Sequence, residues 1–337
     1  MKCKTVDDVL KAMSVDDVFT NNPSILKAEY REYLKMFHPD FHNGEMTYQE
    51  VTSKIVMFYE KATDLIARGT WEESNKIRLN KPNGKTLIVS YLKEYSFELG
   101  KMYLCNNHIV YVVPRQHKKY YDNYISSIKF SCPRDMMQSV DYALPHIVQN
   151  FENNDECVII IKREHGCVPL SEVWNNFNGK IPIKHTAWVI SRLLNLACFL
   201  SYNNVVHNGI DINSCFVDIE KHGVMLYGGW WYTRPVDAKM IGVSSEVYDV
   251  MPPSAKRNKK SKKSTDMECI KMLGIKLLGC TSKISDATVP DQIMMWLRTG
   301  SGEYPPTEMK RWEMSLDAAF GKRTFTKMNP EMGKIKV

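Results

Sequence analysis

A proline-containing tripeptide, His38-Pro39-Asp40, fixes where one predicted helix has to end and the next can begin. It follows a short, basic, amphipathic segment, 26–37, and precedes a polar loop, 41–45, and a second amphipathic segment. Proline lacks a backbone N–H and disfavours helical geometry in the residue before it, so the first helix is predicted to stop near Phe37. The His38 imidazole and the Asp40 carboxylate are then held on a rigid corner between two helices, which suits docking better than packing.

Helical periodicity on both sides of the tripeptide predicts a helix hairpin. Apolar residues recur at helical spacing in both segments: Leu26, Tyr30, Tyr33, Leu34 and Phe37 before it, and Val51, Ile55, Phe58, Ala62 and Leu65 after it. A separate basic stripe, Lys27, Arg31 and Lys35, recurs every four residues. With a leading segment at 15–20, these patterns predict a small all-α domain over residues 1–72, built on an antiparallel helix hairpin.

This predicted domain resembles a J-domain, the module by which co-chaperones engage ATP-driven DnaK-type (heat-shock protein 70) chaperones. The tripeptide and the basic stripe carry the resemblance, which covers roughly residues 5–70. One departure is the leader, which reads Val-Asp-Asp-Val-Phe-Thr where J-domains usually begin with a Tyr-x-x-Leu-Gly-like helix. The resemblance implies that the stripe steers toward an acidic chaperone surface and that the tripeptide supplies the activating corner. An ordinary helix hairpin with a proline turn is the alternative.

Composition favours a cytosolic protein of two domains. The 337 residues are enough for two domains, and the 44% hydrophobic content is ordinary for a globular protein. No apolar run approaches the roughly 18 residues needed to span a bilayer, and the amino terminus lacks the apolar core of a signal peptide. We therefore predict a cytoplasmic location, in the host cytoplasm if the chain is phage-encoded, with no membrane partner.

The nine cysteines predict buried, reduced thiols. Their number is odd, they contain no C-x-x-C pair, and most lie in apolar stretches, so neither a disulfide framework nor a zinc site is expected. His38 and His42 are four residues apart, but the proline break lies between them, so they do not share a helical face. We predict no metal and no cofactor.

The formal net charge of +7 comes mainly from one basic run. Positions 256–263 hold six lysine and arginine residues, and without them the chain would carry +1. We predict a flexible, solvated loop there, with a polyanion contact or a phosphorylation-sensitive loop as the alternatives. Nucleic acid is therefore not the expected partner.

Beyond the helices the pattern changes to short strands and then to helices. Residues 73–84 are polar, with a turn cluster at 80–84, and predict a linker. Strands are predicted at 87–92, 101–105, 108–113, 124–130 and 157–161, and the pattern is mainly helical from 186 onward. A sheet-rich lobe at 85–165 followed by a helical lobe at 166–337 is the order of a protein kinase, which the chain resembles over about residues 85–320.

The segment after the long apolar helix resembles a kinase catalytic segment in position but not in residue identity. Kinases carry H-R-D-x-x-x-x-N, then a hairpin, then D-F-G. His207 matches the kinase histidine, but the catalytic-base position is Gly209, the metal-binding asparagine position is Ser214 and the D-F-G aspartate position is Tyr227. Glycine has no side-chain acceptor and tyrosine is a poor magnesium ligand at neutral pH. The resemblance therefore implies a pseudokinase without catalytic activity.

A few residues keep a nucleotide-binding alternative open. Asp211 and Asn213 lie close to the degenerate positions and are candidates for displaced substitutes, while Lys129 stands where a strand lysine would grip phosphates. The corresponding glycine-rich turn offers only Gly100. Asp266, which opens an apolar helix, resembles the large-lobe aspartate that buttresses the catalytic loop; a plain helix cap is the other reading.

Together these features predict a multidomain protein with an all-α J-domain followed by an α+β, two-lobed protein-kinase-like domain. The expected function is a co-chaperone that recruits and stimulates a DnaK-type ATPase, while the second domain binds an unknown client or partner. The alternative is an atypical kinase or nucleotide-binding regulator that uses Lys129, Asp211 and Asn213. Fusions of J-domains to kinase-like domains occur among bacteria and their phages, and this chain resembles them.

Overall fold

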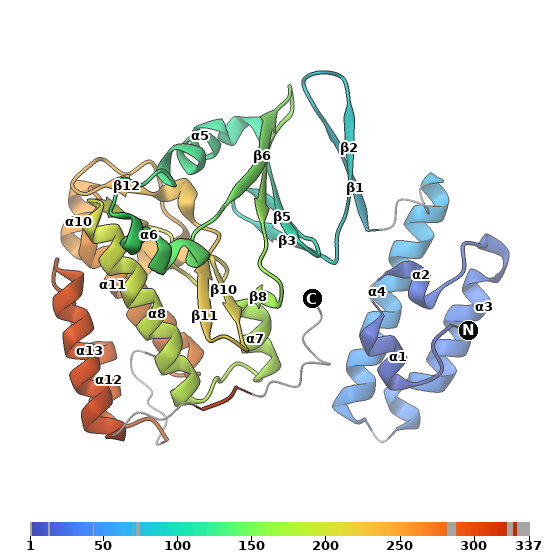
Figure 1. Ribbon diagram of the computed structural model, residues 1–337. Helices are drawn as coiled ribbons and strands as arrows, with labels where there is room; N and C mark the ends of the chain where they lie inside the picture. Colours follow the sequence, from blue (N-terminus) through green and yellow to red (C-terminus); the bar gives the residue numbers. More distant parts are fainter. Residues whose placement is uncertain are drawn as a thin grey trace. The chain divides into compact units, whose positions relative to one another are not determined.

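We describe the protein from a computed structural model (Figure 1). The described residues are 2–12, 14–42, 44–69, 71, 75–281, 288–321 and 326–328, so the start of the predicted linker and the end of the predicted helical lobe fall outside them. The chain divides into two compact units, Met1–Tyr95 with Tyr103–Asn106, and Ser96–Met102 with Asn107–Pro330. Each unit is described by itself.

The first unit begins with helices: α1 Val6–Lys11, α2 Val15–Val18, α3 Pro23–Phe37, the 3-10 turn η1 Pro39–Phe41, and α4 Met46–Arg68. The predicted hairpin is confirmed, since α3 packs on α4 and ends at Phe37, immediately before the tripeptide. Asn22 caps the start of α3 by accepting a hydrogen bond from the Ser24 N–H, and Gly69 ends α4 in a left-handed conformation with φ of 66°. The sequence reading missed α1.

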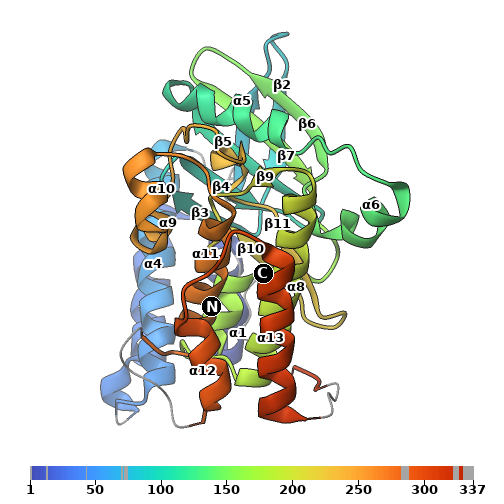
Figure 2. The ribbon, with the colours of Figure 1, turned by 90° about the vertical axis from the view of Figure 1, so that its left-hand side faces the viewer.

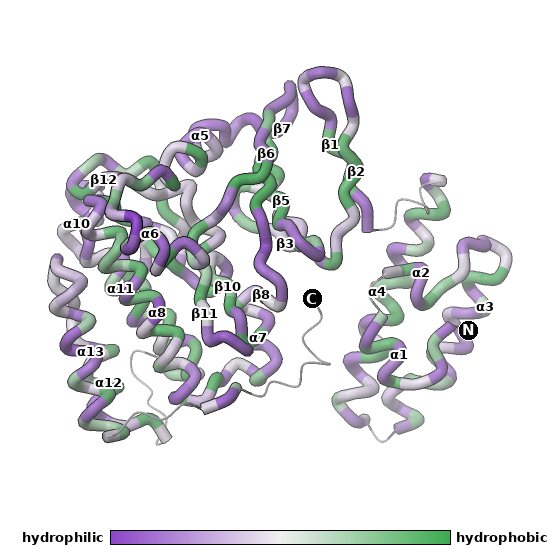
Figure 3. Tube along the Cα trace, viewed as in Figure 1, coloured by the Kyte–Doolittle hydropathy of each residue, from purple (hydrophilic) through white to green (hydrophobic). Residues whose placement is uncertain are grey.

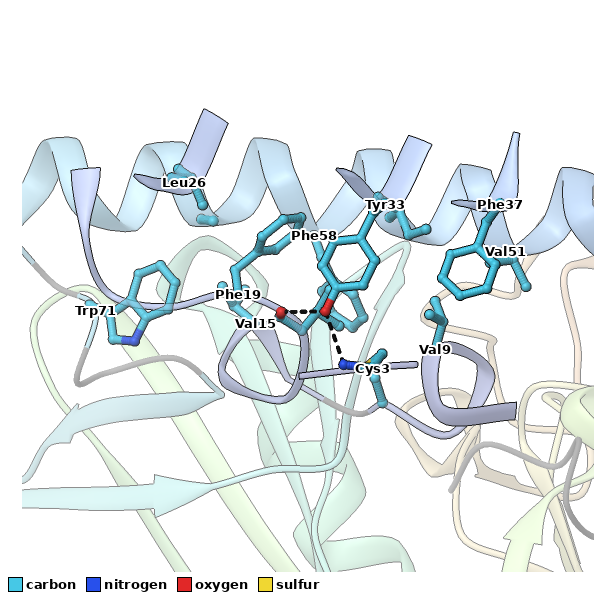
Figure 4. Packing of buried hydrophobic residues seen from close by; sticks show 14 residues of the cluster. Cys3, Val9, Val15, Phe19, Leu26, Tyr33, Phe37, Val51, Phe58 and Trp71 are labelled. Atoms are coloured by element: carbon cyan, nitrogen blue, oxygen red, sulfur yellow. Dashed lines mark hydrogen bonds between the residues drawn. The ribbon is translucent and has the colours of Figure 1, made fainter. Parts of the chain in front are cut away.

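Buried side chains from all four helices form the core of this unit (Figure 4). The predicted apolar stripes supply most of it, including Leu26, Tyr33, Phe37, Val51, Ile55, Phe58 and Ala62. The Tyr33 hydroxyl donates to the Val18 carbonyl at 2.9 Å and accepts from the Cys3 N–H at 3.0 Å. Burial raises the pKa of Tyr33 to about 12, so this hydroxyl stays neutral. It therefore joins α3 to Cys3, which precedes α1, and to Val18, the last residue of α2.

A two-stranded hairpin follows the helices in the same unit. Its strands, β1 Lys76–Asn80 and β2 Thr86–Ser90, are antiparallel, and the pairs Ile77–Val89 and Leu79–Leu87 share one face. The segment predicted as a linker therefore contains a strand, and the turn cluster at 80–84 closes a hairpin. The alternation of polar and apolar residues in β1 is the signal that the linker reading overlooked.

The second unit contains most of a five-stranded sheet in the order β3-β4-β5-β7-β6. Its strands are β3 Lys93–Phe97, β4 Gly100–Leu104, β5 His108–Pro114, β6 Ile147–Glu152 and β7 Glu156–Lys162; β3 and β4 straddle the division between the units. The pairs β5–β7 and β6–β7 are antiparallel. The predicted strands at 101–105, 108–113 and 157–161 are confirmed.

The connection from β5 to β6 is helical. It holds η3 Arg115–His117, α5 Lys118–Ser127, α6 Arg134–Val140 and η4 Asp141–Ala143. The predicted strand at 124–130 is therefore wrong. Its aromatic and β-branched residues are typical of strands, but Tyr121 and Tyr124 are buried at helical spacing on one face of α5.

The remainder of the second unit is mainly helical, as predicted. Its helices are α7 Leu170–Asn176, α8 Ile183–Tyr202, α9 Ser245–Val250, α10 Pro253–Asn258, α11 Lys263–Leu277, α12 Asp291–Arg298 and α13 Pro305–Phe320. Figure 2 shows α8, α11, α12 and α13 running beside one another, and each packs on at least two of the others. The predicted basic loop is correct only in part: positions 256–258 lie in α10 and Lys263 begins α11, while 259–262 form a short link, in which Lys259 and Lys260 are exposed.

Short strands carry the segment with the degenerate kinase positions. β8 Cys167–Pro169, β10 Cys215–Asp218 and β11 Gly223–Leu226 form one sheet, β9 Val205–Val206 pairs with β12 Arg234–Pro235, and η5 Trp230–Tyr232 lies between β11 and β12. Residues along β10 and β11 are predominantly apolar (Figure 3), and all of them are buried. No disulfide bond joins any of the nine cysteines, all of which lie in the described ranges, and seven of them are buried. Within the described ranges, no helix has the length and apolarity to cross a membrane.

Candidate functional site

The His38-Pro39-Asp40 corner lies between α3 and α4 and is open to solvent. The His38 Nδ1 accepts a hydrogen bond from the Asp40 backbone N–H at 3.3 Å and lies 3.5 Å from the Asp40 carboxylate. The Asp40 side chain is 82% exposed. The imidazole and the carboxylate are therefore held beside each other without being buried, and both face solvent where a partner can reach them.

Contacts on the inner side hold the corner in place. Thr52 of α4 donates to the Phe37 carbonyl at 2.8 Å. His42 Nε2 donates to the Met36 carbonyl at 2.8 Å, and its ring stacks on Tyr48 with 3.6 Å between the ring centroids. The corner is thus a fixed turn supported by both helices, which reduces the ordering cost of binding.

The predicted basic stripe is exposed along α3. Lys27, Arg31 and Lys35 all lie on the solvent side, opposite the buried stripe of the same helix. Two large apolar side chains that the sequence reading passed over flank the corner: Met36 is 41% exposed and Phe41 is 69% exposed. The sequence could have indicated Phe41 as a contact residue, because it is an aromatic residue within an otherwise polar loop. The surface around the corner therefore combines positive charge with apolar area.

In the second unit, Asp266 of α11 holds the segment that resembles a kinase catalytic loop. Its two carboxylate oxygens accept hydrogen bonds from the backbone N–H groups of His207 at 2.8 Å and Asn208 at 2.9 Å. Burial raises the pKa of Asp266 to about 7, against the lowering effect of these two bonds. The buttress reading is confirmed and the cap reading is wrong, since Lys262 occupies the cap position of α11.

His207 is a structural residue in this loop. It is fully buried, and burial lowers its pKa to about 3, so the ring is neutral at physiological pH. Its ring meets the Trp230 ring edge to face at 4.7 Å. Asn208 has φ of 57° and donates from its side chain to the Ser261 hydroxyl at 2.8 Å. The loop is therefore fixed by packing and by backbone bonds.

Backbone fills the space beside the catalytic-base position. A Cβ atom on Gly209 would lie 2.7 Å from the Gly229 carbonyl oxygen and 2.9 Å from its Cα. The neighbouring Gly228 donates its N–H to the Ser214 carbonyl at 3.0 Å, and a Cβ there would lie 2.9 Å from the Ser214 Cα. The segment after β11, which contains Gly228 and Gly229, thus lies directly against the loop that contains Gly209. A side chain at position 209 fits only if that segment moves away.

The three residues of the nucleotide-binding alternative have different surroundings. Asp211 Oδ1 accepts from the backbone N–H groups of Asn213 and Ser214 at 2.9 and 2.8 Å, so it caps its own turn. Burial raises the pKa of Asp211 to about 6. Asn213 is exposed, and Lys129 is exposed in the loop after α5, on no strand. Within the described residues no hydrogen bond or ion pair joins Lys129 to Asp211 or to Asn213.

An aromatic cluster that the sequence reading missed lies beside this loop. The buried Trp231 ring of η5 contacts Phe97 of β3 at 5.4 Å, Tyr111 of β5 at 5.0 Å and Tyr124 of α5 at 4.5 Å between ring centroids. The Tyr124 hydroxyl donates to the Tyr227 carbonyl at 2.8 Å. The run Trp-Trp-Tyr after two glycines was the signal available in the sequence.

Polar contacts hold the cluster from both sides. The Asn123 side-chain amide of α5 donates to the carbonyls of Trp231 at 3.0 Å and Thr233 at 2.8 Å. The Tyr232 hydroxyl donates to Glu98, in the turn between β3 and β4, at 3.0 Å. That turn, which precedes Gly100, is the one that corresponds to a kinase glycine-rich loop, and the Tyr232 side chain ties it to η5.

Comparison with known proteins identifies the fold and nothing finer. No family model matches the chain, and no curated protein matches it in sequence. Among solved structures it is similar to one described as "Structure of vaccinia related kinase 3", with a TM-score of 0.54 and 12% sequence identity over 72% of this chain and 90% of that chain. The chain therefore contains a kinase-like fold.

The strand and helix beside the aromatic cluster, β5 and α5, also lack a charged pair that kinases use. Kinases carry a lysine on the third strand of the small lobe that pairs with a glutamate on the following helix. Here β5 contains no lysine and α5 contains no glutamate. The two elements face each other through Tyr111 and Tyr124, whose ring centroids are 6.0 Å apart. The prediction that Lys129 is a strand lysine is wrong, because that residue lies in the loop after α5.

Proposed function

We propose that this chain is a co-chaperone that recruits a DnaK-type chaperone and stimulates its ATP hydrolysis. The observation that carries the proposal is the exposed His38-Pro39-Asp40 corner, fixed by a helix hairpin whose solvent face bears Lys27, Arg31 and Lys35. A fixed corner with positive charge beside it suits an acidic docking surface, because the charges speed encounter and the turn needs little ordering. The cytoplasm, where such a chaperone works, is the proposed location.

In the same proposal the kinase-like unit binds a client or partner protein and does no phosphoryl transfer. Magnesium-dependent transfer needs carboxylates that hold the metal and a base near the acceptor hydroxyl. The close approach of Gly209 to Gly229 and the Tyr111–Tyr124 pairing support this view. The nucleotide-binding alternative gains no support from Lys129, which is exposed in a loop.

Changing His38 to Gln is expected to abolish stimulation of the chaperone. The test is single-turnover ATP hydrolysis by a DnaK-type chaperone with the full chain added. The wild-type protein is expected to accelerate hydrolysis, with an effect that weakens as salt rises, because the basic stripe acts through screened charges. The variant is expected to leave the chaperone at its basal rate.

A stability measurement serves as the control for this change. His38 is partly exposed, so the substitution is expected to change the free energy of unfolding by only about 0.5 kcal/mol. Failure of the wild-type chain to stimulate the chaperone, or equal stimulation by the variant, would contradict the co-chaperone proposal.

Introducing a carboxylate at position 209 is expected to destabilise the kinase-like unit without restoring transfer. Gly209→Asp and Gly209→Ala each force a Cβ against the Gly229 backbone, so a loss of about 1–3 kcal/mol or more is expected in urea unfolding. Glycine to alanine at Gly300, where nothing lies within 4 Å, is the control. Magnesium-dependent phosphoryl transfer from labelled ATP by the wild type or by the aspartate variant would show that the unit is an enzyme.

A further inference from the structure

A groove in the second unit lies between α6, η4, α8 and the starts of α11 and α13. Its volume is about 660 Å³, within the range of ligand-binding clefts. A second hollow of about 350 Å³ shares Ser139, Tyr142 and Arg192 with it. The two hollows therefore join into one depression along α8.

The groove has an apolar floor and an aromatic rim. Leu196 and Phe199 of α8 lie buried in the floor. Three tyrosines stand around it with large exposed fractions: Tyr142 at 42%, Tyr202 at 59% and Tyr304 at 62%. Tyrosine and arginine are the residues that most often dominate binding energy at protein interfaces, since they combine a rigid apolar body with polar atoms.

The charges that line the 660 Å³ groove are both positive. They belong to Arg192 and Lys263, and no carboxylate is among the lining residues. Arg192 donates from Nε to the His222 carbonyl at 3.2 Å, and within the described ranges its other guanidinium N–H groups make no hydrogen bond. Two carboxylates line the adjoining 350 Å³ hollow, and each pairs with a lysine: Asp218 with Lys221 at 3.3 Å and Glu164 with Lys162 at 2.6 Å. Two other acids near the groove are also engaged: Glu303 accepts from the Ser264 N–H at 3.2 Å, and Asp141 lies 3.4 Å from His146 Nε2.

We propose that this groove binds an acidic peptide segment of a partner protein, with an apolar side chain on the floor and carboxylates at Arg192 and Lys263. The inference rests on the proposed scaffold role of the kinase-like unit and names the place and chemistry of the contact. An arginine with free, forked N–H groups pairs with a carboxylate through two hydrogen bonds, which gives direction as well as attraction. Lys263 adds a second point charge.

The test is selection of random peptides on the full-length protein, followed by affinity measurements with the peptides selected. A phage-displayed library is expected to yield peptides in which aspartate or glutamate flanks an aromatic or aliphatic residue. Fluorescence anisotropy with the synthetic peptide is expected to show affinity that falls as salt rises. The double variant Arg192→Glu/Lys263→Glu is expected to weaken binding about tenfold or more, as reversal of two facing charges should.

Matched charge reversals on two helices that border the groove give the control. Lys184→Glu/Lys310→Glu changes the same number of charges on α8 and α13, at exposed positions outside the groove lining, and is expected to leave the affinity unchanged. Peptides without acidic residues, equal affinity for Arg192→Glu/Lys263→Glu, or equally tight binding of an oligothymidylate to the same site would each overturn the proposal.

This outcome is separable from that of the co-chaperone proposal. Arg192→Glu/Lys263→Glu leaves the His38-Pro39-Asp40 corner unchanged, so it is expected to stimulate the chaperone as the wild type does in the absence of a client. Loss of peptide binding with intact stimulation supports the groove, whereas failure of stimulation by the wild type contradicts the co-chaperone role and leaves the peptide measurement to decide the groove.

Discussion

Replacing Trp231 with alanine is expected to lower the free energy of unfolding of the kinase-like unit by about 3–5 kcal/mol. The side chain is 3% exposed and its ring touches Phe97, Tyr111 and Tyr124, which come from three different elements. Removing it leaves a cavity at the point where the sheet, α5 and the chain after β11 meet. Urea unfolding of the full chain, followed by circular dichroism, measures the loss.

Two further variants make this measurement specific. Trp231→Phe keeps an aromatic ring and is expected to cost less than the alanine change. Met295→Ala, at a side chain that is 69% exposed on α12, is expected to stay within about 0.5 kcal/mol of the wild type. A loss below about 1 kcal/mol for Trp231→Ala would show that the cluster does not organise this unit.

Trp231→Ala also tests whether Trp231 covers a nucleotide site that is otherwise able to bind ATP. If Trp231 only covered a competent nucleotide site, its removal would allow magnesium-dependent ATP binding. We expect none, because β5 has no lysine, α5 has no glutamate and Gly209 offers no carboxylate. Calorimetric titration of the variant with magnesium and ATP, at a temperature where it is folded, tests this. Measurable affinity would revive the nucleotide-switch alternative.

The parts that sequence alone predicted are those set by local patterns. The α3–α4 hairpin follows from apolar periodicity and from Pro39, whose ring ends the first helix by a local steric effect that needs no distant contact. The role of Asp266 was also predictable, because the position of that residue after the loop is set by the order of the kinase-like segments. Its two bonds to the loop confirm that reading.

The parts that sequence alone missed depend on distant partners. Residues 124–130 are rich in aromatic and β-branched types and were predicted as a strand. They begin instead inside a helix, because Tyr124 buries its ring against Trp231, more than a hundred positions away in the chain. Intrinsic preference is a weak guide where such tertiary contacts decide. The aromatic cluster could not be predicted, because nothing in the sequence indicates that Phe97 and Trp231 are in contact.

Replacing Asp266 with alanine is the second change expected to have a large effect. Its carboxylate is buried and is the acceptor for two backbone donors, at His207 and Asn208. Each buried N–H left without an acceptor costs about 1–3 kcal/mol, so a total loss of about 2–6 kcal/mol is expected in urea unfolding. Asp266→Asn keeps one acceptor and turns an amide N–H toward the other donor, so about 1–3 kcal/mol is expected.

The pH dependence gives these variants a second readout. Burial raises the pKa of Asp266 to about 7 in the folded protein, whereas an aspartate in the unfolded chain titrates near 3.8. Between those values the folded state binds more protons than the unfolded state, so this carboxyl favours folding at low pH and loses that contribution as pH rises through about 7. Asparagine does not titrate. The stability difference between wild type and Asp266→Asn is therefore expected to be larger at pH 5.5 than at pH 8.

A neighbouring buried residue of the same helix provides the matched control. The Thr265 hydroxyl is buried and has no hydrogen-bond partner in the described part of the chain, and Thr265→Val preserves the side-chain shape. That change removes an unpaired polar group, so it is expected to be neutral or slightly stabilising at every pH. A stability difference for Asp266→Asn that matches this control and does not change with pH would show that the carboxylate does not hold the loop. A larger loss for Asp266→Asn that depends on pH would instead show that Asp266 holds the loop that contains Gly209.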